Sequence, residues 1–87
     1  MQDELCLAQH KVVGTKQTLK ALENGETGAV YIAEDAEAKV VRPVLSLCEE
    51  KGIEVRRVET MIELGKMCGI KVKAASAAII ENQKEVD

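Results

Sequence analysis

The chain has almost no aromatic side chains, because Tyr31 is the single member of this class and neither Trp nor Phe occurs. RNA-binding domains that stack unpaired bases on the aromatic residues of a sheet depend on several such side chains. The composition therefore excludes that mode of recognition. It leaves open the recognition of a nucleic acid by its shape, its backbone and its groove edges.

Paired metal ligands and catalytic motifs are missing as well. Cys6, Cys48 and Cys68 stand far apart, and His10 is the only histidine. Structural zinc sites use closely spaced ligands such as C-x-x-C, so we expect no metal. An odd number of isolated thiols suits a reducing cytoplasm. Because nucleophile elbows, phosphate loops and dinucleotide-binding glycine patterns are also absent, we expect neither an enzyme nor a cofactor.

Long apolar runs and a strong positive charge are the remaining absences. No run approaches the roughly 18 residues of a membrane-spanning helix, and no targeting segment is recognisable, so we expect a cytoplasmic protein without a membrane partner. The net charge of −3 disfavours a polyanionic partner at first sight, but much of the acidity lies at the two ends. Residues 5–80 hold eleven Lys and Arg against ten Asp and Glu. A nucleic-acid site must therefore be a local patch.

The sequence does contain alternating helix and strand patterns. Strands are predicted at 11–13, 28–33, 53–58 and 74–80, and helices at 3–10, 15–23, 40–51 and 60–67. We expect Glu34 and Asp35 to cap the next helix, Pro43 to lie in its first turn, and Thr60 and Glu63 to form a capping box. This order of elements needs helices on both faces of a sheet. We predict a three-layer α/β/α sandwich with a central four-stranded mixed sheet, in which residues 1–80 form one domain and 81–87 a polar acidic tail.

The most informative stretch is Gly14-Thr15-Lys16-Gln17-Thr18-Leu19-Lys20. A glycine turn that leads directly into a helix exposes backbone N–H groups that suit an anion such as phosphate. Lys16 and Gln17 would project from the first turn, where their side chains can donate to guanine O6 and N7 or bridge neighbouring base edges. Lys20 follows one turn later, in a position for a phosphate. Taken alone, the stretch is more typical of an ordinary capped helix with a solvated face.

A second stretch, Gly69-Ile70-Lys71-Val72-Lys73-Ala74-Ala75, combines two lysines with two aliphatic residues that we expect to be exposed. In a half-buried edge strand this pattern is unremarkable. In an RNA-binding loop, Ile70 and Val72 would provide apolar contact for an extruded base, and Lys71 and Lys73 would provide cations for the backbone. Lys66, one helical turn earlier, could extend the patch.

Taken together, these motifs resemble a known family. Four stretches are similar in order and spacing to the landmarks of the L-seven-Ae family. They are Gly14 to Lys20, Val30 to Ala33 with Asp35, Leu64-Gly65, and Ile70 to Ala78. Its members are kink-turn-binding ribosomal proteins and their relatives in snoRNPs. The resemblance covers about residues 5–80 and implies the sandwich fold, no enzymatic activity, and binding of kink-turns. In a kink-turn, a three-nucleotide bulge beside tandem sheared G·A pairs bends an RNA duplex sharply.

The resemblance also implies a role for each stretch. The helix after Gly14 would enter the major groove at the G·A pairs, and the loop before the last strand would cover the bulged nucleotides. The expected RNA-binding residues are Gly14, Thr15, Lys16, Gln17, Lys20, Lys66, Ile70, Lys71, Val72 and Lys73. Archaeal and eukaryotic members have Asn-Glu where this chain has Lys16-Gln17, a version that resembles the short bacterial members.

The expected partner is a structured RNA with a kink-turn, in ribosomal RNA, a riboswitch or another host, bound by a monomer. The alternative is a protein–protein adaptor on the same fold with no RNA role.

Overall fold

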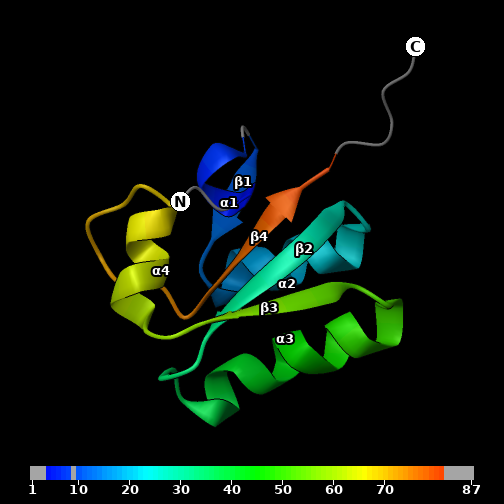
Figure 1. Ribbon diagram of the computed structural model, residues 1–87. Coiled ribbons are helices and arrows are strands. Elements are labelled where there is room, and N and C mark those ends of the chain that lie inside the picture. The colour runs from blue at the N-terminus through cyan, green and yellow to red at the C-terminus, as the bar shows by residue number, and fades with distance from the viewer. Residues whose placement is uncertain (1–3, 9, 82–87) are drawn as a thin grey trace.

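Four helices alternate with four strands along the chain in the computed structural model, which describes residues 4–8 and 10–81 (Figure 1). The elements are α1 (Glu4–Leu7), β1 (Lys11–Val13), α2 (Thr15–Asn24), β2 (Thr27–Ala33), α3 (Ala38–Lys51), β3 (Glu54–Val58), α4 (Met61–Met67) and β4 (Ser76–Ile80). The predicted order of elements is thus confirmed. Beyond its first residue, the predicted tail at 81–87 lies outside the described residues. Among the described helices, none has the length and apolar character needed to cross a membrane.

The four strands form one mixed sheet in the order β1-β4-β2-β3. β2 runs parallel to β3, whereas β4 pairs antiparallel with both β2 and β1. The parallel pair is joined through α3, as the crossover between parallel strands requires. The central strands β2 and β4 are mostly apolar and largely buried, because helices cover both faces of the sheet.

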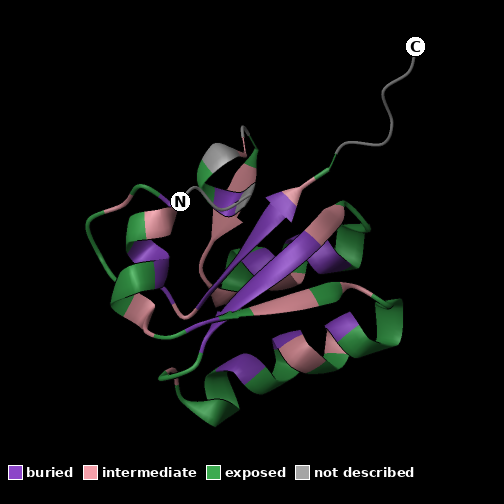
Figure 2. Ribbon diagram, viewed as in Figure 1, coloured by how far each residue is buried: buried purple, intermediate pink, exposed green. Residues whose placement is uncertain are grey.

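The sheet divides the interior into two apolar clusters, one on each face (Figure 2). Tyr31 and Ala77 lie on the face covered by α1 and α4, where they pack with Leu5 and Leu64. The neighbouring β2 residue, Val30, lies on the opposite face, which α2 and α3 cover. Successive strand residues point to opposite faces, and this alternation produces the predicted three layers.

Two helix ends and one helix start follow their sequence signals. Gly25 and Gly52 end α2 and α3 in the left-handed conformation, at φ +74° and +69°, and their backbone N–H groups donate to carbonyls of the preceding turn. At the start of α4, Thr60 Oγ1 accepts a hydrogen bond from the backbone N of Glu63 at 3.0 Å. The side-chain half of the predicted capping box is therefore present.

Two expectations around α3 are wrong. Pro43 is the sixth residue of α3 and not part of its first turn, because the helix begins earlier than predicted, at Ala38. The N-cap residue is Glu37, which caps without a side-chain hydrogen bond. Asp35 does not cap α3 either. Its Oδ1 accepts from the backbone N of Met61 at 2.8 Å, so that the carboxylate after β2 caps α4 instead.

Candidate nucleic-acid interface

Gly14 forms the turn that connects β1 to α2. Its φ of +103° lies in a region that residues with a Cβ rarely adopt. Its backbone N donates to the carbonyl of Ser76 at 2.8 Å, and its carbonyl accepts from the backbone N of Thr18 at 3.0 Å. No side chain of the described residues caps α2. The backbone N–H groups of Thr15, Lys16 and Gln17 therefore remain free of the helix ladder, as an anion site requires.

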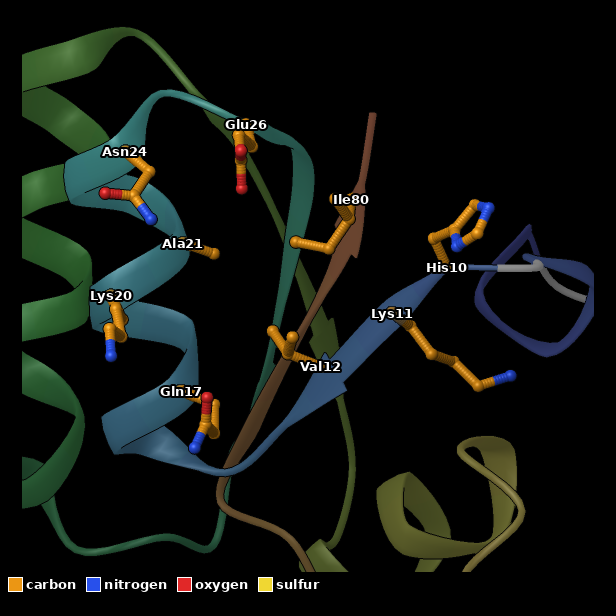
Figure 3. Close-up of a pocket in the computed structure, with 9 residues that line it drawn as sticks. All are labelled: His10, Lys11, Val12, Gln17, Lys20, Ala21, Asn24, Glu26 and Ile80. Carbon is orange, nitrogen blue, oxygen red and sulfur yellow. The ribbon is translucent and has the colours of Figure 1, made fainter. Parts of the chain in front are cut away.

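The side chains of the first two turns of α2 separate into two faces. Thr18 is fully buried, whereas Lys16, Gln17 and Lys20 are exposed. Gln17 and Lys20 are three residues apart and hence neighbours on the helix surface. Both line the hollow between α2 and β1 that Figure 3 shows. The structure thus brings Gln17 and Lys20, two of the three predicted contact side chains of α2, to one surface.

The second predicted stretch is a loop, which settles its ambiguity between loop and strand, since β4 begins only at Ser76. The loop is held against α4 by backbone hydrogen bonds at both ends. The backbone N of Ile70 donates to the carbonyl of Gly65 at 3.1 Å, and that of Ala74 to the carbonyl of Met61 at 3.0 Å. A Cβ on Gly65 would overlap with the carbonyl oxygen of Val72. Glycine at this position therefore permits the close approach of the loop to the helix.

The two aliphatic residues of the loop differ in exposure. Val72 is 68% exposed at the loop surface, and its neighbours Lys71 and Lys73 are exposed as well. Ile70, which we expected to be exposed, is half-buried and packs against the apolar cluster of the α4 face. It anchors the loop, and this leaves Val72 as the loop's exposed apolar contact.

Ser76 joins the two stretches. Its carbonyl accepts from the backbone N of Gly14, and its Oγ lies 3.1 Å from Thr15 Oγ1. Ser76 is fully buried, and it follows directly after the loop as the first residue of β4. The start of α2 and the end of the loop therefore meet at one place, although they are about sixty residues apart in sequence. No local sequence signal indicates this contact, because a lone serine before an apolar run is an ordinary strand residue.

The five lysines expected at the site are all exposed. Within the described part of the chain, none of them forms an ion pair. Lys16 and Lys20 belong to the α2 stretch, whereas Lys66, Lys71 and Lys73 belong to α4 and the loop after it. Exposed ammonium groups therefore lie on both stretches, as a nucleic-acid site on a chain of this overall charge would need.

Cys48 and Cys68 do not form a reactive centre. Cys48 and Cys68 are buried as small apolar side chains, and Cys6 is exposed. Burial raises the pKa of the Cys48 thiol. It also raises the pKa of the Cys68 thiol, an effect that nearby Lys11 opposes and Cys6 reinforces. A raised pKa keeps a thiol protonated and unreactive. Among the described residues, no three His, Cys, Asp or Glu side chains gather as a metal site would need.

The fold and this paired surface define a class of protein: a small α/β/α sandwich that exposes a glycine-initiated helix and a lysine-bearing loop side by side. The chain belongs to the ribosomal protein L7Ae/L30e/S12e/Gadd45 family, whose model matches residues 5–87. This confirms the family resemblance drawn from the motifs.

Individual relatives agree with this assignment. The chain is 53% identical over 74 residues to an RNA-binding protein, TTE2299, of Caldanaerobacter subterraneus, covering 85% of this chain and 90% of the relative. It is 44% identical over 68 residues to the large ribosomal subunit protein eL8 of Halobacterium salinarum, covering 77% of this chain and 57% of that protein. Among solved structures, the Giardia lamblia 15.5kD RNA binding protein superposes with a TM-score of 0.80 at 26% identity, covering 91% of this chain and 67% of that one. The family is not enzymatic, in agreement with the expectation from the sequence.

Proposed function

We propose that this member of an RNA-binding family recognises kink-turns in structured RNA and stabilises their bent form. In this proposal, Lys16, Gln17 and Lys20 contact the tandem G·A pairs and the adjoining phosphates. The loop presents Val72 to the bulged nucleotides, and Lys66, Lys71 and Lys73 to the backbone. Gly14 and Thr15 shape the start of α2, and Ile70 anchors the loop.

One observation carries the proposal, namely that Ser76 bonds to the α2 turn through both its carbonyl and its hydroxyl, at 2.8 and 3.1 Å. A kink-turn presents its G·A pairs and its bulge next to each other, so a protein that reads both needs two contacting segments at a fixed separation. The bonds of Ser76 fix the separation of the two segments that the motifs single out. Preorganised segments lose less conformational entropy on binding.

The relatives support RNA as the partner. The Caldanaerobacter and Giardia proteins are named as RNA-binding, and the Halobacterium relative is a large-subunit ribosomal protein. Ribosomal RNA is therefore one candidate host of the kink-turn, and a riboswitch is another. We propose that the protein acts as a cytoplasmic monomer.

The test is an electrophoretic shift with a kink-turn duplex and with the same duplex lacking its bulge. The proposal expects a shift of the first RNA at protein concentrations that leave the second unbound. Equal binding of the two RNAs would contradict kink-turn recognition and leave a general RNA binder. Binding of neither RNA would favour the adaptor alternative.

A further inference from the structure

A hollow of about 510 Å³ lies between α2 and the edge strand β1, beside the surface proposed for the G·A pairs (Figure 3). Its apolar floor consists of Val12, Ala21 and Ile80, which are buried or half-buried. Its volume is within the range of about 300–1,000 Å³ that is typical of sites for small molecules. The proposed function leaves the floor of this hollow without a role.

Polar groups surround the floor. Gln17, Lys20 and Asn24 follow one another along one side of α2, at spacings of three and four residues, and all three are exposed. Glu26 adds a carboxylate from the turn after the helix. His10 lines the hollow as well, so the rim carries two amides, an imidazole, an ammonium group and a carboxylate.

Lys11 also borders the hollow, but its ammonium group is directed elsewhere. In Figure 3 its side chain runs away from α2. Its Nζ lies 3.4 Å from the carbonyls of both Leu5 and Ala8, to which it donates at the end of α1. Of the two lysines that line the hollow, Lys20 is therefore the one whose ammonium group is available to an occupant, and it lies between Gln17 and Asn24 along α2.

This set of groups matches the parts of a nucleotide. A side-chain amide pairs with the N6 and N7 edge of adenine, as Asn24 could. A carboxylate such as that of Glu26 accepts hydrogen bonds from the hydroxyls of a ribose. An ammonium group such as that of Lys20 pairs with a phosphate as a point charge. The apolar floor gives the base a surface to lie on, in a chain whose only aromatic residue, Tyr31, is buried elsewhere.

We propose that the hollow binds one unpaired nucleotide, preferably an adenosine nucleotide, with its base between Asn24 and the floor and its phosphate toward Lys20. The inference rests on the proposed function in one respect. Gln17 and Lys20 belong to both surfaces, so RNA held on α2 continues into the hollow. The nucleotide then belongs to the bound RNA, next to the kink-turn. A free nucleotide offers the same chemistry.

The first arm of the test uses adenosine monophosphate as the probe. It is titrated into isotope-labelled protein and followed by NMR, with Asn24→Ala as the variant and Glu23→Ala as its matched control. Asn24 and Glu23 are exposed neighbours on α2, and Glu23 does not line the hollow. We expect saturable shifts of the side-chain amide signals of Asn24 and Gln17. Asn24→Ala should weaken binding about fivefold or more, and Glu23→Ala should leave it unchanged.

The second arm compares a blunt kink-turn RNA with versions that carry one unpaired adenosine at either stem end. We expect one of the two overhangs to tighten binding about fivefold in the wild-type protein and in Glu23→Ala, and not in Asn24→Ala. If adenosine monophosphate gives saturable shifts but neither overhang tightens RNA binding, the occupant of the hollow is a free nucleotide. If an overhang tightens RNA binding, the occupant is a nucleotide of the RNA. If neither appears, the proposal is overturned. If the wild-type protein binds no kink-turn RNA but adenosine monophosphate still gives saturable NMR shifts, only the proposed function is overturned.

Discussion

Thr15 Oγ1 and Ser76 Oγ lie 3.1 Å apart, at the point where the first turn of α2 meets the first residue of β4. Ser76 is fully buried and Thr15 is half-buried. Each hydroxyl therefore depends on the other for part of its hydrogen bonding, and removal of either hydroxyl leaves the other without this hydrogen-bond partner. The pair couples two segments that are distant in sequence, so its energetic effect should appear as non-additivity.

A double-mutant cycle measures this coupling. Thr15→Val leaves the buried Ser76 hydroxyl without its partner and should lower the free energy of unfolding by about 1–3 kcal/mol. Ser76→Ala should cost about 1 kcal/mol. The double variant should be less destabilised than the sum of the two, by about 1 kcal/mol, because neither hydroxyl then remains. Urea denaturation provides the free energies. Strict additivity would mean that the two hydroxyls do not interact.

Gln17→Ala tests base reading by α2. We expect a loss of about 1–3 kcal/mol in affinity for a kink-turn with G·A pairs, because the amide contacts base edges. The loss should be much smaller for an RNA in which Watson–Crick pairs replace the sheared pairs. Filter binding with both RNAs gives the comparison, and Glu23→Ala on the same helix serves as control. Unchanged discrimination in Gln17→Ala would remove the base-reading role of this side chain.

Lys71→Ala tests the charge of the loop. About four or five lysines can reach phosphates, which predicts a slope of log K against log salt near −3 at about 0.7 per contact. The variant should weaken binding of all kink-turn RNAs to a similar extent and flatten the slope by about 0.7. The matched control is Lys39→Ala, an exposed lysine in the first turn of α3. A slope that is the same in Lys71→Ala and Lys39→Ala would exclude Lys71 from the phosphate contacts.

Gly65→Ala tests the seat of the loop on α4. The added Cβ overlaps with the carbonyl oxygen of Val72, a backbone atom that moves only with the loop. We expect a loss of about 1–3 kcal/mol in the free energy of unfolding, the usual cost of overpacking, together with weaker RNA binding. Lys66→Ala, at the next and exposed position of α4, should alter stability by no more than about 0.5 kcal/mol. Equal stabilities of the two variants would show that the loop moves to accommodate the added Cβ with no loss in the free energy of unfolding.

Stability at high pH tests the buried thiol of Cys48. Because burial raises its pKa in the folded state above the ordinary value of 9.0, folding favours the protonated thiol. The resulting stability is complete below about pH 9 and is lost as the pH rises through the raised folded pKa. Urea denaturation between pH 8 and 11, under reducing conditions, should show a smaller alkaline decline in Cys48→Ala than in the wild type. Parallel declines would mean that other groups cause the alkaline loss.

The sequence predicted those parts of the structure that local patterns determine. Alternating apolar runs and glycine stops located the strands and the ends of α2 and α3, and Thr60-x-x-Glu63 located the start of α4. The cap supplied by Asp35 was misassigned because its acceptor bonds across 26 residues to Met61. A carboxylate before a helix pattern is the same signal whichever helix it caps.

The candidate site was predictable as two separate stretches. Family motifs singled out both, but nothing local specified how they meet, because Ser76 contributes through its position in the sheet and not through a motif. The prediction that Ile70 is exposed was also wrong. Its apolar character is shared with Val72, and only the path of the loop over α4 turns one residue inward and leaves the other outside.

Tyr31 is 1% exposed in the apolar cluster of the α4 face, its ring lies 5.5 Å from the Arg56 guanidinium carbon, and its hydroxyl accepts from Arg56 Nη1 at 2.7 Å. With no Trp or Phe in the sequence, it is also the protein's only aromatic fluorophore. Its intrinsic emission therefore comes from one fixed place in the core. A buried ring is shielded from direct contact with RNA, so its emission reports unfolding. RNA titrations therefore need a probe attached elsewhere on the protein. Near 280 nm, the absorbance of even a small amount of co-purifying RNA exceeds that of this single phenol, and protein concentrations need a method independent of aromatic absorbance.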